Sequence, residues 1–209
     1  MISRNFATGL SGFITFLAAT PLFAHHAMGG ETPLSFAGGL LSGLAHPVIG
    51  VDHLLFLLVT GVLLFTLSRP LAYLITGVFV GGTLLGTVLH LMAVNLPLAE
   101  VIIAVSLVCG GLMLFLRKGI DPSILGLFFV GSGVFHGYAY GESIIGAEAM
   151  PLGAYLLGFS LTQFVVVTAI SLVVRQVIAK ASLVILPTER VVGGMAVAGG
   201  VFFLVSSLS

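Results

Sequence analysis

Long apolar stretches, separated by short polar segments, are the feature of this sequence that most constrains its fold. Five stretches have the length of a membrane crossing: 71–93, 98–116, 122–140, 152–174 and 191–208. A helix needs about 20 apolar residues to cross the ~30 Å hydrocarbon core of a bilayer. Only 7% of the residues are charged, whereas a soluble globule carries about 25%. The sequence therefore predicts an all-α, polytopic membrane helix bundle whose surface faces lipid.

A sixth apolar run, residues 34–67, is too long for one straight crossing. As a single helix it would extend for about 50 Å, well beyond the hydrocarbon core. Pro47 and Gly50 lie in its middle, and a proline inside a helix removes a backbone donor and strains the preceding turn. We expect one crossing that is broken near Pro47–Gly50, with a short outer segment followed by a full helix. The prediction is therefore six transmembrane spans.

The positive charges predict the orientation of these spans. Cytoplasmic loops carry an excess of lysine and arginine. When six spans alternate, every such residue after the first 24 falls on one side: Arg69, Arg117, Lys118, Arg175, Lys180 and Arg190. We therefore expect a multi-pass protein of a bacterial-type inner membrane, with both mature termini outside. The oligomeric state does not follow from the sequence.

The first 24 residues have the layout of a secretory signal. A short positive segment at residues 1–4 precedes the apolar stretch 6–23, and Ala24 offers a small residue for cleavage. We expect a signal peptide over 1–24, cleaved after Ala24, and a single transmembrane domain over 25–209. The alternative is an uncleaved first helix, and both arrangements place residue 25 outside the cytoplasm.

Glycine pairs at four-residue spacing indicate how the helices pack. Small residues at this spacing let two helices approach closely in lipid. The pairs are Gly39/Gly43, Gly77/Gly81, Gly82/Gly86, Gly133/Gly137 and Gly137/Gly141. We expect these glycines to lie mainly at helix–helix contacts.

Charge and cysteine content exclude several classes of function. The formal net charge is zero, which excludes the basic surface of a nucleic-acid-binding protein. The single cysteine, Cys109, excludes a disulfide framework and a CxxC metal or redox site. No nucleotide-binding motif is present, so ATP hydrolysis by this chain is not expected. The expected partners are the lipid bilayer and a small ligand.

Histidines and acids inside the apolar runs are the strongest functional signal. Ionisable groups within a membrane are costly and mark functional sites. Asp52 is adjacent to His53, and Glu142 follows His136 by six residues. Imidazole and carboxylate without thiol suit a divalent transition metal. The candidate metal ligands are His46, Asp52, His53, His136 and Glu142, with His90, His25 and His26 as further candidates.

Helix geometry bears on which of these residues can share one ion. In an unbroken helix His46 and His53 lie on one face but about 10 Å apart, too far to bind the same metal. A break between them would allow them to converge. Asp52 either ligates the ion or orients a ligating imidazole. His90 is equally suited to an interhelical hydrogen bond, and the polarity of His25 and His26 is equally compatible with a signal-peptide junction.

Two motifs resemble those of a known family. Residues 46–53 read HPVIGVDH and fit the pattern H-P-x-x-G-x-D-H, while residues 135–142 read FHGYAYGE. In this order, and with the apolar runs, they resemble the HupE/UreJ family of nickel/cobalt permeases, which is linked with hydrogenase and urease maturation. The resemblance implies uptake of Ni²⁺ or Co²⁺ into the cytoplasm. It also implies functional roles for the motif residues His46, Asp52, His53, His136 and Glu142.

We therefore expect a transporter rather than an enzyme, with Ni²⁺ or Co²⁺ as transported substrate and no prosthetic group. The donors of both motifs should converge in the outer half of a common cavity. Two alternatives remain at this point. One is a membrane haem protein with His53, His90 and His136 as axial ligands. The other is an intramembrane zinc hydrolase, although the HExxH signature is absent.

Overall fold

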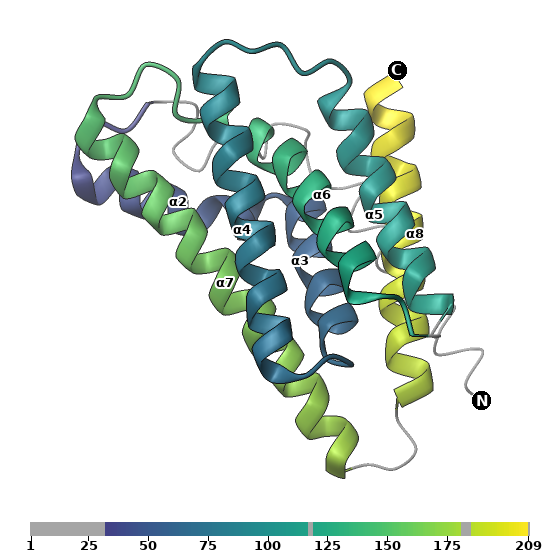
Figure 1. The fold of residues 1–209 in the computed structure, drawn as a ribbon. Helices are drawn as coiled ribbons and strands as arrows, with labels where there is room; N and C mark the ends of the chain where they lie inside the picture. Colours follow the sequence, from purple (N-terminus) through teal and green to yellow (C-terminus); the bar gives the residue numbers. More distant parts are fainter. Residues whose placement is uncertain (1–31, 117–118, 181–184, 209) are drawn as a thin grey trace.

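The computed structural model describes residues 32–116, 119–180 and 185–208, and over these residues it is all-helical (Figure 1). The helices are α2 (Phe36–Ile49), α3 (Val51–Leu64), α4 (Arg69–Leu91), α5 (Ala99–Leu116), α6 (Pro122–Glu142), α7 (Ala149–Lys180) and α8 (Ile185–Leu208). The predicted all-α class is confirmed for this part of the chain. The expected signal peptide over residues 1–24, together with His25 and His26, lies outside the described residues.

The expected break in the first apolar run is present at Gly50. Helices α2 and α3 meet there at an angle of 73°. A Cβ atom on Gly50 would lie 2.7 Å from the ring of His53 and 3.2 Å from the carboxylate of Asp52, so the corner has no room for a side chain. Each helix has 14 residues. Helix α3 is therefore shorter than the full-length helix that we expected after the break. Together the two halves make one candidate span.

The described helices account for four or five of the six expected crossings. Four helices (α4, α6, α7 and α8) are each long and apolar enough to cross a bilayer, and the bent α2–α3 pair is the fifth candidate. Helix α5 is apolar but has only 18 residues, about 27 Å in length, slightly less than the hydrocarbon core. The expected number of six spans is thus only partly matched by the described helices. Four or five candidate spans still make the protein a multi-pass helix bundle.

Helix α3 forms the centre of the bundle. The outer helices pack as the pairs α4–α6, α5–α8 and α2–α7, and α3 contacts α7, α5 and α8 (Figure 1). Phe56, Leu57, Val59 and Leu64 of α3 are fully buried. The corner at Gly50 places His46 of α2 and Asp52 and His53 of α3 in the interior of the bundle, whereas Val48 and Ile49 are exposed.

The closest helix contact is between α4 and α6, at Gly86 and Gly137. A Cβ atom on Gly86 would collide with the carbonyl oxygen of Val134, and one on Gly137 with that of Thr83. These glycines therefore serve backbone-to-backbone packing, as their spacing predicts. The prediction was wrong for Gly77 and Gly81, because Cβ atoms there would meet nothing within 4 Å.

Arg175 of α7 binds the end of α3. Its guanidinium donates hydrogen bonds to the carbonyl oxygens of Leu64, at 3.1 Å, and of Leu67. The last carbonyls of a helix lack partners within the helix, and a cation there also complements the helix dipole. Arg175 therefore caps α3 from a neighbouring helix.

Candidate metal-binding site

Four of the predicted ligands meet at the corner between α2 and α3. His46 lies near the end of α2, Asp52 and His53 lie at the start of α3, and His136 belongs to α6. All four are buried. The ring centroids of His46 and His53 are 5.8 Å apart, and those of His53 and His136 are 5.1 Å apart. The two motifs, more than 80 residues apart in sequence, therefore form one cluster.

The cluster is joined by a direct contact between two imidazoles. The Nδ1 atoms of His53 and His136 are 3.0 Å apart, which is a hydrogen-bond distance. A carboxylate oxygen of Asp52 lies 3.7 Å from the same Nδ1 of His53. Asp52 thus places negative charge beside the imidazole pair.

A chain of hydrogen bonds assigns the protons of His136 and His53. The Ser106 hydroxyl donates its one proton to the carbonyl oxygen of Ile103 at 2.7 Å. Its oxygen, 3.2 Å from Nε2 of His136, therefore accepts a hydrogen bond from that nitrogen. A neutral His136 then has no proton on Nδ1, so the Nδ1–H of His53 donates to it. This assignment leaves Nε2 of His53 unprotonated, with a lone pair that can bind a metal.

A second chain of hydrogen bonds orients His46. The hydroxyl of Tyr155 on α7 donates its proton to the carbonyl oxygen of Tyr140 at 2.8 Å. This carbonyl is in the last turn of α6, where helix carbonyls need external donors. The hydroxyl oxygen, 3.1 Å from Nδ1 of His46, therefore accepts from that nitrogen. This contact orients the ring of His46 within the cluster.

Aromatic rings enclose the imidazoles. Tyr140 contacts His46 and His53 edge-on, with centroids 4.9 Å and 4.6 Å away. Phe56 lies 4.3 Å from His136. These contacts pack the three imidazoles against aromatic rings and restrict their orientations.

A cluster of phenylalanines follows beyond His136, toward the other end of α3. Phe56 lies 5.6 Å from Phe79 and 6.0 Å from Phe128, while Phe128 and Phe129 are 5.3 Å apart between centroids. Phe56, Phe79 and Phe129 are fully buried. The polar site is therefore closed off from the opposite end of the bundle by packed apolar rings.

In this conformation the histidine and aspartate side chains lie next to one another but do not surround a common point where a metal ion could bind. Over the described residues, no three histidine, cysteine or carboxylate side chains are placed so that they could hold one metal ion. The contact between Nδ1 of His53 and Nδ1 of His136 occupies two of the nitrogens. Full coordination would therefore require rotation of a ring, or water as additional ligands.

The structure does not bring His90 and Glu142 into this cluster. His90 packs on Tyr138, with ring centroids 4.4 Å apart, and its Cβ is close to Gly141. Glu142 is exposed at the end of α6. Six residues turn an α-helix through about 600°, so Glu142 and His136 point in different directions from α6.

Sequence reasoning missed Tyr155 and Ser106, which hold the histidine tautomers. Both are buried in apolar helices and lie outside the two motifs. Their only signal in the sequence is a hydrogen-bonding group within a span, a feature that many other residues of this chain share.

Comparison with known proteins agrees with the motifs. Residues 13–203 match the profile of a family described as HupE / UreJ protein. The chain is also similar to Protein HupE of Rhizobium leguminosarum bv. viciae, with 29% identity over 123 residues, which cover 59% of this chain and 62% of the relative. No solved structure matches the chain. Because the family profile covers far more than half of the sequence, the chain belongs to the HupE/UreJ family.

Proposed function

We propose that this protein transports a divalent transition-metal cation, Ni²⁺ or Co²⁺, across the membrane toward the cytoplasm. The observation that carries the proposal is the buried cluster of His46, His53 and His136, in which a carboxylate oxygen of Asp52 lies 3.7 Å from Nδ1 of His53. Neutral imidazole is a preferred ligand for nickel, and carboxylate adds charge compensation. Membership of the HupE/UreJ family supports the same substrate class and a link with hydrogenase or urease maturation.

The distribution of charge supports an outward-facing cluster. His53 lies at the start of α3, whereas Arg69 begins α4 just after α3 ends, and Arg175 binds the final carbonyls of α3. Basic residues near span ends favour the cytoplasmic side. In this orientation the histidine cluster lies toward the outer side of a bacterial-type inner membrane.

The mechanism follows from the ligand set. A hydrated cation exchanges part of its water shell for the imidazole nitrogens of His46 and His53, and Asp52 offsets its charge. The phenylalanines behind His136 must separate before the ion can move on, because apolar rings cannot replace lost hydration. Conduction also requires that the following sites bind weakly enough for release.

Uptake into proteoliposomes tests this function directly. Vesicles containing the protein should accumulate Ni²⁺ or Co²⁺ faster than empty vesicles, and much faster than Mg²⁺, which prefers oxygen ligands. Uptake should fall as the external solution is acidified, because protons compete for the ligand atoms. Equal accumulation by protein-containing and empty vesicles would contradict the proposal.

The substitution Tyr155→Phe tests the assigned tautomer of His46. It removes the hydroxyl that accepts the proton of Nδ1 and leaves the ring in place, so His46 loses the partner that fixes its orientation. Loss of a partner that orients a metal ligand weakens metal binding by about 10–100-fold. A Ni²⁺ titration of the solubilised protein measures this change.

Tyr73→Phe is the matched control, since Tyr73 is exposed on α4 and its hydroxyl has no contact with the cluster among the described residues. The control should bind Ni²⁺ like the wild type. An unchanged affinity in Tyr155→Phe would show that the hydroxyl does not set the metal-binding form of His46.

A further inference from the structure

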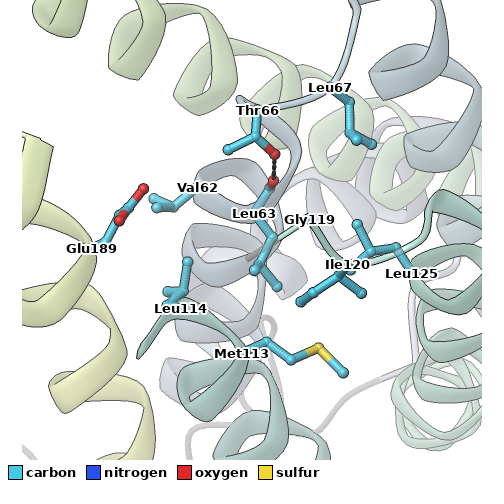
Figure 2. A pocket seen from close by; sticks show the side chains of 10 residues that line it. All are labelled: Val62, Leu63, Thr66, Leu67, Met113, Leu114, Gly119, Ile120, Leu125 and Glu189. Atoms are coloured by element: carbon cyan, nitrogen blue, oxygen red, sulfur yellow. Dashed lines mark hydrogen bonds between the residues drawn. The ribbon is translucent and has the colours of Figure 1, made fainter. Parts of the chain in front are cut away.

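A second polar feature lies at the opposite end of α3 from the histidines. A partly open cavity of about 200 Å³ is lined by residues of α3, α5, α6 and α8 and of the segments next to them. Figure 2 shows Glu189 of α8 on one side of it and Thr66, which follows α3, on another. A single water needs about 10–15 Å³ on this measure, so the cavity has room for an ion with several of its waters.

Two side chains, those of Glu189 and Thr66, supply oxygen atoms to this otherwise apolar cavity. Glu189 is only 7% exposed, and its carboxylate points toward Val62 in Figure 2. The Thr66 hydroxyl donates to the carbonyl oxygen of Leu63 at 3.1 Å, so its lone pairs stay available as acceptors. Leu114 and Met113 line the cavity from α5.

Glu189 is buried at the start of a membrane-spanning stretch. It is the second residue of the stretch Thr188–Leu208, which is apolar enough to cross the membrane. An ionisable group that is buried at such a position is costly and marks a site of function.

We propose that this cavity is an inner, low-affinity site for the transported divalent cation, with Glu189 as its one carboxylate ligand. The inference rests on the proposed transport function and deepens it. A single carboxylate with retained waters is the pattern by which hydrated divalent ions are held weakly. Oxygen ligands bind Ni²⁺ and Co²⁺ less tightly than imidazoles do. Affinity therefore falls from the histidine cluster to Glu189, which favours release at the far end.

The test combines binding and transport of Ni²⁺ by the full chain. Wild-type protein in detergent should show a tighter and a weaker class of Ni²⁺ binding in calorimetry. Glu189→Gln should lose the weaker class, keep the tighter class, and slow Ni²⁺ uptake by proteoliposomes several-fold. His53→Ala should show the reverse in binding, with loss of the tighter class only. Glu148→Gln is the control, because it removes an exposed carboxylate outside the cavity.

The outcomes separate the inner site from the proposed function. Normal uptake and unchanged weak binding in Glu189→Gln would overturn the inner site and leave transport intact, whereas wild-type protein without uptake would overturn transport itself. If Glu189→Gln does not reach the membrane, Glu189→Asp decides. This variant keeps the carboxylate, but its side chain is shorter by one methylene and reaches less far into the cavity. Uptake should therefore be slower than in the wild type. Wild-type uptake by Glu189→Asp would overturn the proposal.

Discussion

His53→Ala is expected to abolish most Ni²⁺ uptake, while His90→Ala leaves most of it. His53 is at the centre of the cluster, bonded to His136 and 5.8 Å from the ring of His46. Its removal takes away a proposed metal ligand and also the hydrogen-bond partner of His136. Loss of a supporting partner alone typically weakens metal sites 10–100-fold, so loss of the ligand should reduce the uptake rate by at least about tenfold.

His90 is the matched control because it is also a membrane histidine but packs on Tyr138 outside the cluster. Initial rates of Ni²⁺ uptake, normalised to the amount of protein in the membrane, measure both variants. Equal loss of uptake in the two variants would contradict the site as the structure defines it, and normal uptake in His53→Ala would contradict the metal-binding role of His53.

Gly137→Ala and Gly86→Ala are expected to be strongly destabilising. A methyl group at either position would collide with a backbone carbonyl of the partner helix, Thr83 or Val134. A backbone atom cannot move aside as a side chain can, so α4 and α6 would have to separate. Overpacking commonly costs about 1–3 kcal/mol, occasionally more, and we expect these two variants at or above the upper end.

Gly77→Ala and Gly81→Ala are the matched controls on the same helix. Their new methyl groups meet open space, and alanine is favoured over glycine in a helix by up to about 1 kcal/mol. These variants should therefore be as stable as the wild type or slightly more so. Thermal unfolding can be followed by the reaction of a dye with Cys109, the one thiol of the chain. Similar melting temperatures for all four variants would contradict the α4–α6 contact.

The sequence predicted the helical class and the broken helix because both depend on local chemistry. Apolar runs of spanning length determine the class, and the Pro47–Gly50 stretch identifies the break. The angle at Gly50 and the short length of α3 could not be predicted from the sequence, because both depend on how the neighbouring helices pack against α3. The sequence also could not separate Gly86, at a helix contact, from Gly81, which faces outward.

The sequence predicted the types of residue in the candidate site, but only some of the residues that it named lie in the cluster. His46, Asp52, His53 and His136 converge, as the motifs led us to expect. Glu142 belongs to the same motif as His136 but is exposed at the helix end. The partners that assign the tautomers, Tyr155 and Ser106, come from other helices, and only the three-dimensional arrangement reveals them.

Helix α7 has a consequence for how the two ends of the protein communicate. It is a rod of 32 residues, about 48 Å long. Near one end of α7, Tyr155 is hydrogen-bonded to His46, and Gly158 packs against the backbone of α2. Nearer the other end, Arg175 donates a hydrogen bond to the carbonyl oxygen of Leu64, the last residue of α3. Because α7 is one continuous helix, the contact that orients His46 and the contact that caps α3 are held by the same element. A change in the tilt of α7 would therefore displace both contacts together.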